Sequence, residues 1–487
     1  MPDTPSAPAP VILGNEPGSF PHGVLAERHP AIIRQVREAF PYDPERQRAL
    51  DALLANCTEG VIEPLPADAH DRERWTAWGM DAYVGRSWFD VPWLWAESHF
   101  YRRLLDAVGH FGPGAWQGVD PFRPAKLAEL DAPETDEELA ALDGLGDLPA
   151  DEQTRALLHG SLWGNRADLG FRLSTSGTGT GTGPGAGDET RALVADDSDA
   201  LWSLLAPSGT DTSGTDTSGA TPSGAAASGT TLSGATPSGA TPPGATASRA
   251  TAPTSAPTGP GVTASGPGVT ASPGPGVTAS GPGVTASPGP GGTATGPRTL
   301  CLVADNAGRE LVPDLLLVSH LLAQGRVDRA VLHVKPYPYY VSDATTADVL
   351  DALRRLVAAG GAAAAYGRRL WAALTDGRVT VRAHPFSCAP LPYADMPADL
   401  REEFAAATVT VLKGDLNYRR LVGDRWWPPT TSFADVTAYF PGPVAALRTL
   451  KSDVITGLSP DTEAALEASG EQRWRTSGTH ALIQVRR

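Results

Sequence analysis

The spacing of apolar residues divides the chain into a helical first part and a mixed α/β second part. From about Gly18 to Phe171, apolar residues recur at intervals of three and four, as in HPAIIRQVREAF and WLWAESHFYRRLLDAVGHF, and this spacing predicts amphipathic helices. After Arg298 the pattern changes to short runs rich in β-branched residues with helical segments between them. The runs cover residues 299–304, 330–334, 378–383, 408–412 and 480–486, and the main helical segments cover 310–323, 347–358 and 364–374.

Alternating strands and helices indicate an α/β fold, with a helical N-terminal part packed on a doubly wound, mostly parallel α/β/α sheet domain. We expect the helical domain at residues 18–172 and the α/β domain at 188–206 plus 298–487, with residues 191–206 forming a strand and then a helix. Ligands of such sheets bind beyond the carboxyl ends of the strands. That edge is therefore where candidate chemistry is sought.

Residues 207–297 are built almost wholly of Ala, Gly, Pro, Ser and Thr, with a recurring GPGVTAS motif. Such a segment has too few large apolar residues to offset the entropy of ordering, and it predicts a disordered insertion. A second glycine-rich tract, GTGTGTGPGAG at residues 177–187, formally contains a G-x-G pattern. It neither follows a predicted strand nor opens a helix, so we do not interpret it as a nucleotide-binding loop.

Charge and composition narrow the classes of function. The 39 Lys and Arg residues against 55 Asp and Glu residues give a net charge of −16, which argues against a nucleic-acid or anionic-membrane partner. The chain shows neither a signal-peptide pattern nor an apolar run of membrane-spanning length, and we expect a soluble cytoplasmic protein. Three widely spaced cysteines, Cys57, Cys301 and Cys388, predict buried free thiols rather than disulfides or a zinc cluster.

Acidic and amide side chains follow two of the predicted strands. Asp305 and Asn306 come directly after residues 299–304, with Glu310 at the start of the next helix, and Asp343 follows residues 330–334. Asp305, Asn306 and Asp343 offer hard oxygen ligands for one divalent cation, with positions left for water and phosphate oxygens. Taken alone, each motif is more typical of a strand-to-helix turn or a helix cap than of a metal site.

Cationic residues follow the later strands. Lys413 and Gly414 come directly after residues 408–412, where the glycine lets backbone N–H groups surround a phosphate and the lysine supplies charge. Asp415 and Asn417 can hydrogen-bond a polyol or the waters of a metal ion. Arg448 and Lys451 lie three residues apart further on, a spacing that a solvated charge pair also explains.

The chain has only four lysines against 35 arginines, and Lys335, Lys413 and Lys451 all lie in or beside these segments. We found no role for the fourth lysine, Lys126. The convergence of acidic, amide and lysine side chains after strands predicts a divalent-metal and phosphate site at one rim of the sheet.

These motifs carry a family resemblance. The segments VADNAGRELVPDLLLVSHLL, KPYPYYVSD, LKGDLNYRRLVGDRWW and LRTLK, with SLWGNRADLGF and WFDVPWLWAESHFYRRLL in the helical part, resemble the metal-dependent damage-control phosphatases. The match is to subfamily III, also described as acidic-residue (protein-glutamate) O-methyltransferase-like. It covers essentially the whole chain outside residues 207–297.

The resemblance implies a phosphatase that hydrolyses small sugar phosphate monoesters such as fructose 1-phosphate, as part of metabolite damage control. It also implies a Mn²⁺, Ni²⁺, Co²⁺ or Mg²⁺ ion on Asp305, Asn306 and Asp343, which would be the catalytic centre. The substrate contacts that it implies are Glu310, Lys413, Gly414, Asp415, Leu416, Asn417 and Lys451, and Glu97, Asn165 and Asp168 match further family positions without a clear role. Whether Asp305 attacks phosphorus or the metal delivers a hydroxide stays open.

Two other functions are compatible with the sequence. The family's second description suggests an S-adenosylmethionine-dependent carboxyl methyltransferase. Against it, the glycine-rich tract at residues 177–187 is misplaced for a cofactor loop, and methyl transfer needs no lysine-and-metal site. The other alternative is a non-catalytic protein that binds a sugar phosphate. The sequence predicts neither protein partners nor an oligomeric state.

Overall fold

The computed structural model of the 487-residue chain describes residues 9–164, 193–206, 296–469 and 474–487. The glycine tract at 177–187, nearly all of the expected insertion at 207–297, and the candidate residues Asn165 and Asp168 lie outside these ranges. The three cysteines are buried and free, as expected.

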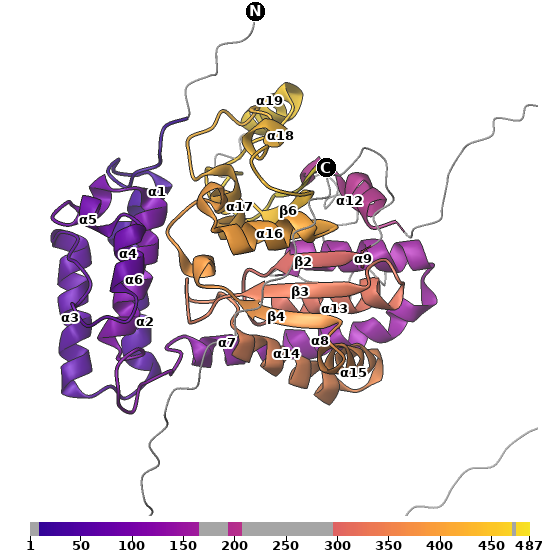
Figure 1. Cartoon of the computed structure of the whole chain (residues 1–487), viewed down its shortest axis with the longest axis horizontal. Helices are drawn as coiled ribbons and strands as arrows, with labels where there is room; N and C mark the ends of the chain where they lie inside the picture. Colours follow the sequence, from indigo (N-terminus) through magenta and orange to yellow (C-terminus); the bar gives the residue numbers. More distant parts are fainter. Residues whose placement is uncertain (1–8, 165–192, 207–295, 470–473) are drawn as a thin grey trace, which may run out of the picture. The chain divides into compact units, whose positions relative to one another are not determined.

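The helices up to residue 164 confirm the helical first part. They are α1 (Phe20–Gly23), the π-helix η1 (Val24–Arg28), α2 (His29–Ala39), α3 (Pro44–Glu59), α4 (Arg72–Ala77), α5 (Met80–Tyr83), α6 (Trp93–Ala107), α7 (Arg123–Leu130), α8 (Pro133–Ala141) and α9 (Ala150–Trp163), with short 3₁₀ turns between some of them. Helices α2, α3 and α6 run side by side (Figure 1). Helix α6 is buried along almost its whole length, so it forms the centre of this part.

The later elements alternate between strand and helix. The strands are β1 (Leu193–Asp196), β2 (Thr299–Val303), β3 (Arg329–Val334), β4 (Val379–Ala383), β5 (Val409–Lys413), β6 (Val444–Thr449) and β7 (Ala481–Arg486). The helices are α12 (Ser198–Leu204), α13 (Leu311–Ala323), α14 (Thr346–Ala359), α15 (Gly361–Thr375), α16 (Ala398–Ala406), α17 (Gly414–Val422), α18 (Phe433–Val436) and α19 (Pro460–Ala468). The predicted strands and helices are all present, with ends shifted by a few residues.

Strand β6 was not predicted. Its sequence, VAALRT, contains two alanines and follows Pro-Gly-Pro, a composition that gives a weak strand signal. It nevertheless lies between β5 and β7 and is buried from Val444 to Arg448, so burial on both faces decides its conformation rather than intrinsic propensity.

All seven strands form one sheet in the order β1-β7-β6-β5-β2-β3-β4. The five strands from β6 to β4 are parallel to one another, whereas β7 runs antiparallel to β6 and β1 runs parallel to β7. From β2, the chain first adds β3 and β4 on one side and then β5 and β6 on the other. The winding therefore reverses between β2 and β5, which is where doubly wound sheets form a ligand-binding crevice.

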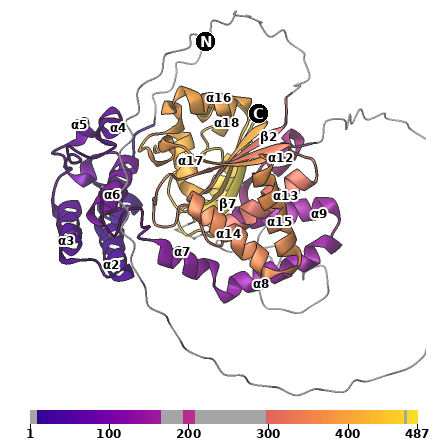
Figure 2. The ribbon, with the colours of Figure 1, turned by 60° about the horizontal axis from the view of Figure 1, so that its bottom comes forward.

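Helices cover both faces of this sheet (Figure 2). Leu300 and Leu302 of β2 join an apolar cluster with helices α9, α13, α14 and α15. Cys301 and Val303, which alternate with them, join a second cluster that includes α6, α16 and α17. The second cluster thus joins the helical first part to the sheet through a continuous apolar core.

No helix among the described residues has both the length and the apolar character needed to cross a membrane.

Candidate active site

The predicted site residues lie at the carboxyl ends of four parallel strands. Asp305 and Asn306 follow β2, Asp343 follows β3, Gly414 opens α17 directly after β5, and Lys451 follows β6. Because β2 and β5 are neighbours at the point where the winding reverses, the structure brings these segments to the same edge of the sheet.

Backbone and side-chain hydrogen bonds join the segments after β2 and β3. The amide of Ala307 donates to the carbonyl of Ser342 at 2.7 Å, and the amide of Ala344 donates to the carbonyl of Asp305 at 2.8 Å. The hydroxyl of Ser342 donates to Oδ1 of Asn306 at 2.7 Å, and Nδ2 of Asn306 donates to a carboxylate oxygen of Glu310 at 2.7 Å. These bonds hold Asn306 beside Asp343 in a fixed orientation.

Neither aspartate serves as a helix cap. Helix α14 has Thr345 as its N-cap, with Asp348 completing a capping box. Helix α13 has Glu310 at its N-cap position. The capping interpretations of Asp305 and Asp343 are therefore wrong, and both carboxylates are available for another role.

Gly414 lies directly against Asp305. Its φ is +80°, in the left-handed region that favours glycine. A Cβ at this position would lie 1.8 Å from Oδ2 of Asp305. No other residue type fits here without displacing the carboxylate.

The turn that carries Asp343 has an unusual backbone. Tyr340 and Val341 both have positive φ, of 48° and 65°, a conformation that is costly for residues with a Cβ and for β-branched ones above all. Helix α6 holds this turn, since Tyr340 stacks on Tyr101 with ring centroids 4.7 Å apart and its hydroxyl donates to Glu97 at 3.3 Å. Packing of the helical part thus stabilises the strained turn next to Asp343.

Lys126, which had no role in the sequence analysis, also contacts this turn. Its ammonium is buried and donates to the backbone carbonyl of Asp343 at 2.9 Å. It forms ion pairs with Asp120 and Asp348, each at 3.0 Å. The lysine therefore connects helix α7, the Asp343 turn and helix α14.

The carboxylates of the site are electrostatically crowded. Burial, together with the carboxylates of Glu310 and Asp343, raises the pKa of Asp305 well above its usual range. Burial also raises the pKa of Asp343 to about 6, although the Lys335 ammonium, 3.3 Å away, acts in the opposite direction. Oδ2 of Asp343, the oxygen nearest to that ammonium, is buried.

A cavity of about 220 Å³ opens between these residues and the helical part. Its lining residues are Phe20, Val24, Arg28, Trp93, Glu97, Asp305, Asn306, Tyr340, Ser342, Asp343, Asp415, Leu416, Arg419 and Lys451. We call this space the inner cavity. Of the expected site residues, it collects Glu97, Asp305, Asn306, Asp343, Asp415, Leu416 and Lys451.

The three cations of the inner cavity differ in their pairing. Arg419 is buried and is neutralised by Glu97 at 2.8 Å and by Asp424 at 2.7 Å. The ammonium of Lys451 and the guanidinium of Arg28 form no hydrogen bond or ion pair with any residue that the structure describes. Lys451 and Arg28 are therefore the cations available to an anionic ligand.

Other expected site residues lie outside the lining of the inner cavity. Lys413 is buried with its ammonium 2.9 Å from Asp314 and bonded to the carbonyl of Ser161. Asn417 is buried and donates to the carbonyls of Ala304 and Lys413. These contacts join α9, α13, β2 and β5, so both side chains support the site from behind rather than face the cavity.

Arg448 also faces away from the cavity. It is buried, lies 2.7 Å from Asp415, and donates to Ser452 and to the carbonyl of Val454. Burial raises the pKa of Asp415, but Arg448 and Arg419 outweigh it and hold the pKa below its usual value. Arg448 thus fixes Asp415 as a charged acceptor at the cavity wall.

Sequence reasoning missed Phe20, Val24, Arg28 and Arg419. Arg419 follows the recognised KGDLN segment directly, and that position was the available signal. Nothing in the sequence distinguishes Arg28 from the other arginines, because its place in the cavity depends on the packing of helices far away in the chain.

The fold and the site together define a class of protein. It is a doubly wound α/β protein whose cavity, lined by carboxylates and a lysine, lies where the winding of the sheet reverses. The chain matches the family model described as damage-control phosphatase ARMT1-like domain over residues 24–220 and 292–466. It belongs to this phosphatase family.

Individual relatives agree with this assignment. Damage-control phosphatase ARMT1 of Danio rerio is 25% identical over 506 residues, covering 96% of this chain and 94% of the relative. The Mus musculus protein of the same name is 34% identical over 188 residues, which cover 38% of this chain and 43% of the relative. Among solved structures, a DUF89 family protein from Pyrococcus horikoshii covers 91% of this chain and 94% of its own at 12% identity, with a TM-score of 0.36, too low to support an argument.

Proposed function

We propose that the chain is a metal-dependent phosphomonoesterase that hydrolyses small sugar phosphates of the fructose 1-phosphate type and so removes damaging metabolites. The observation that supports this most directly is the composition of the inner cavity. It combines two crowded carboxylates, Asp305 and Asp343, with the unpaired ammonium of Lys451. Oxygen ligands beside a free cation match the needs of phosphoryl transfer.

The donor set fits a divalent cation. Asp305, Asn306 and Asp343 supply oxygen atoms from two adjacent loops, and Oδ2 of Asp343 is buried with the Lys335 ammonium 3.3 Å away. A cation would favour the charged carboxylate of Asp305, whose pKa is raised by burial and by the carboxylates of Glu310 and Asp343. Among the residues that the structure describes, no three His, Cys, Asp or Glu side chains form a metal site by themselves, so Asn306 and oxygen atoms of water or substrate must complete the shell.

We assign Mn²⁺, Ni²⁺, Co²⁺ or Mg²⁺ as the class of ion, since hard oxygen ligands suit these metals. When bound, such an ion supplies Lewis-acid polarisation of the phosphoryl group. Lys451 pairs with a phosphate oxygen, and Asp415 accepts a hydrogen bond from a hydroxyl of the sugar. Gly414 lets the phosphoryl group approach Asp305 closely because it has no side chain.

The residues around these groups hold them in place. Lys413 and Asn417 fix the end of β5 against β2, and Glu310 orients the amide of Asn306. Glu97 forms an ion pair with Arg419 and accepts from Tyr340. We propose that these side chains position the groups that contact the phosphate, because each already bonds to another group of the protein.

The proposal leaves two routes open, attack on phosphorus by Asp305 with transient formation of an aspartyl phosphate, or direct attack by water. Acid quenching of a single turnover with a sugar phosphate labelled with ³²P separates them. Attack by Asp305 leaves ³²P bound to the protein as an acyl phosphate that hydroxylamine releases, whereas direct attack leaves no label on the protein.

The methyltransferase alternative makes a different prediction. A methyltransferase binds S-adenosylmethionine tightly in the absence of divalent metal, and calorimetry measures this directly. We expect no such binding. A protein that only binds sugar phosphates would show saturable affinity for them with every metal tested and no release of phosphate.

A further inference from the structure

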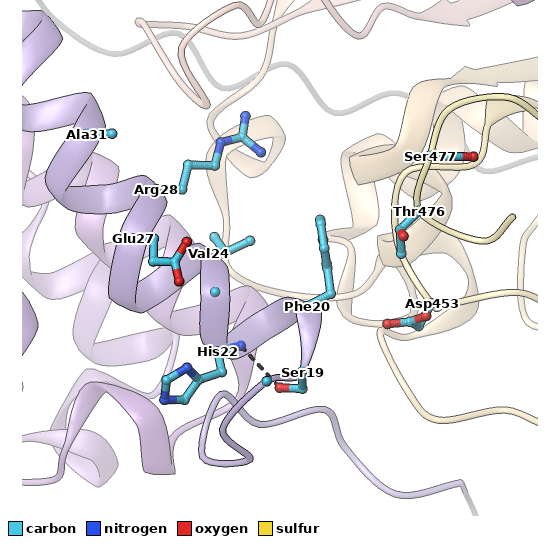
Figure 3. A pocket seen from close by; sticks show the side chains of 12 residues that line it. Ser19, Phe20, His22, Val24, Glu27, Arg28, Ala31, Asp453, Thr476 and Ser477 are labelled. Atoms are coloured by element: carbon cyan, nitrogen blue, oxygen red, sulfur yellow. Dashed lines mark hydrogen bonds between the residues drawn. The ribbon is translucent and has the colours of Figure 1, made fainter. Parts of the chain in front are cut away.

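A second and larger cavity adjoins the inner cavity. It has a volume of about 940 Å³ and lies between residues 18–31 and the C-terminal residues Asp453, Thr476 and Ser477. We call it the outer cavity. Figure 3 shows Phe20, Val24 and Arg28 on one side of it, with Asp453, Thr476 and Ser477 across from them.

Three residues line both cavities. They are Phe20, Val24 and Arg28, which are spaced four apart through α1 and η1 and so share one face of the helix. Val24 and Arg28 both belong to the π-helix η1. This form is rare in proteins overall, but it often occurs at functional sites. A ligand held in the inner cavity can therefore extend past these side chains into the outer one.

The volumes of the two cavities indicate that one substrate occupies both of them. Sites for small molecules usually measure about 300–1,000 Å³, and the inner cavity, at about 220 Å³, lies below this range. It accommodates a phosphate and the adjoining carbons. The distal part of a larger substrate must then occupy the outer cavity.

The lining of the outer cavity indicates the chemistry of that distal part. Arg28 is exposed, and its guanidinium forms no hydrogen bond or ion pair with the described residues. A planar guanidinium binds phosphate or carboxylate through two parallel hydrogen bonds. The hydroxyls of Thr476 and Ser477 and the carboxylates of Glu27 and Asp453 can hydrogen-bond sugar hydroxyls.

We propose that the outer cavity binds the distal end of a sugar phosphate that carries a second anionic group, and that Arg28 recognises this group. The proposal rests on the phosphatase function above and names its preferred substrate class. The hydrolysed phosphate lies at Lys451 and the carboxylate pair, whereas the second anion, a phosphate or a carboxylate, lies at Arg28.

The test compares three substrates with the full-length protein and its activating metal. They are fructose 1,6-bisphosphate, gluconate 6-phosphate and fructose 1-phosphate, which carry a second phosphate, a carboxylate and no second anion. For Arg28→Ala we expect KM to rise about tenfold more for the substrates with a second anion than for fructose 1-phosphate, by loss of a charge-assisted hydrogen bond. Arg28→Lys should recover part of the loss.

Arg34→Ala is the matched control, because Arg34 is an exposed arginine of α2 that lines neither cavity. It should leave all three KM values unchanged. If Arg28→Ala raises KM for fructose 1,6-bisphosphate but not for gluconate 6-phosphate, the second group is a phosphate. If it raises KM for gluconate 6-phosphate but not for the bisphosphate, the second group is a carboxylate. An equal rise for all three substrates, or no change for any, overturns the proposal.

Failure of the proposed function is distinguishable from failure of this inference. If the wild-type protein releases no phosphate from any substrate, calorimetry with the same three compounds still tests Arg28. The outer site is then supported if Arg28→Ala weakens the binding of the compounds with a second anion more than the binding of fructose 1-phosphate. Equal affinities of wild type and variant for each compound contradict it.

Discussion

At the scale of single residues, Lys451 is the most informative cation of the inner cavity. Lys451 is half-buried, lines the cavity, and lowers the pKa of Asp305 by its charge. Lys413, which the sequence made an equal candidate, has its charge neutralised by Asp314. Pairing, rather than residue type, therefore separates a substrate-binding lysine from a structural one.

Lys451→Ala is expected to lower kcat/KM for a sugar phosphate about 100-fold, the usual cost of removing one preorganised group that stabilises developing charge. Steady-state phosphate release measures this. Arg368→Ala, at an exposed position of α15 outside the inner and outer cavities, is the control and should behave as wild type. Equal activities of Lys451→Ala and wild type would remove Lys451 from the site.

Gly414 tests the close approach to Asp305. Gly414→Ala and Gly423→Ala both place a Cβ at a positive φ, of 80° and 89°, which costs about 1–2 kcal/mol of stability in each case. Only the Cβ at 414 collides with Asp305, since the nearest atom at 423 is 3.8 Å away. We expect Gly414→Ala alone to lose activity, and equal kcat values for the two variants would refute the stated contact.

At the scale of elements, the site depends on contacts between the helical part and the loops after β2 and β3. Helix α6 holds the strained turn at Tyr340 and Val341, and helix α7 reaches the same turn through Lys126. The helical part is therefore a component of the site and not only a covering for the sheet.

Lys126→Met is expected to lower the free energy of unfolding by about 3 kcal/mol or more, because it leaves the buried carboxylate of Asp348 and the partly buried carboxylate of Asp120 without their partner. Urea denaturation measures this. Arg123→Met is a matched control from the same helix, since Arg123 pairs with Asp351 at a more exposed position, where such a pair contributes about 0–1 kcal/mol.

Lys126→Met should also lower kcat more than it raises KM. The substitution removes a hydrogen bond that holds the Asp343 turn, and it removes no contact with the substrate. A variant as stable and active as Arg123→Met would contradict both parts of this role.

Helix α2 supplies a pH-dependent contribution to stability. Burial lowers the pKa of His29 to about 3, its ring stacks on Phe100 at 3.7 Å, and neither ring nitrogen has a hydrogen-bond partner among the described residues. The unfolded chain protonates this histidine near pH 6.5 while the folded chain keeps it neutral. The free energy of unfolding is therefore unaffected by the protonation of His29 above about pH 6.5, and it decreases as the pH falls from 6.5 toward 3.

His29→Phe is accordingly expected to make stability less dependent on pH. The difference in unfolding free energy between pH 7.5 and pH 5 should shrink by about 2 kcal/mol relative to wild type. His22→Phe, which removes a half-buried imidazole, serves as the control. An unchanged pH dependence in His29→Phe would show that His29 does not remain neutral in the folded protein.

At the scale of the whole molecule, much of the architecture could be predicted from the sequence. The α/β class followed from local patterns, because the predicted strands are short β-branched runs. The loop positions of Asp305, Asn306 and Asp343 followed from the same strands. Strand β6 was not predicted, because VAALRT forms a strand only through its buried position between β5 and β7.

The parts of the site that could not be predicted depend on contacts between distant segments. Arg28 reaches the cavity from a helix that precedes Asp305 by more than half of the chain, and Lys126 reaches Asp343 across a similar separation. Lys413 carries the residue type expected at a phosphate, and only the packing of α13 shows that Asp314 neutralises it. Spacing within a sequence does not encode such pairings.

The segment from 207 to 297 is expected to be dispensable. The residues that flank it lie together, since the guanidinium of Arg298 donates to the carbonyl of Ala206 at 2.7 Å, so a short glycine-serine linker can join them. Deletion should leave the unfolding midpoint and kcat/KM at their wild-type values, as measured by denaturation and phosphate release. Loss of folding in the deleted protein would show that the segment contributes to the core.

The most direct test of the proposed phosphatase function is phosphate release from fructose 1-phosphate by the full-length protein, measured with Mn²⁺, Ni²⁺, Co²⁺ or Mg²⁺ and after removal of metal by a chelator. We predict saturable turnover with at least one of these ions, none after chelation, and none in correctly folded Asp305→Asn or Asp343→Asn. Undiminished turnover by either variant, or turnover that persists without metal, would contradict the proposed site.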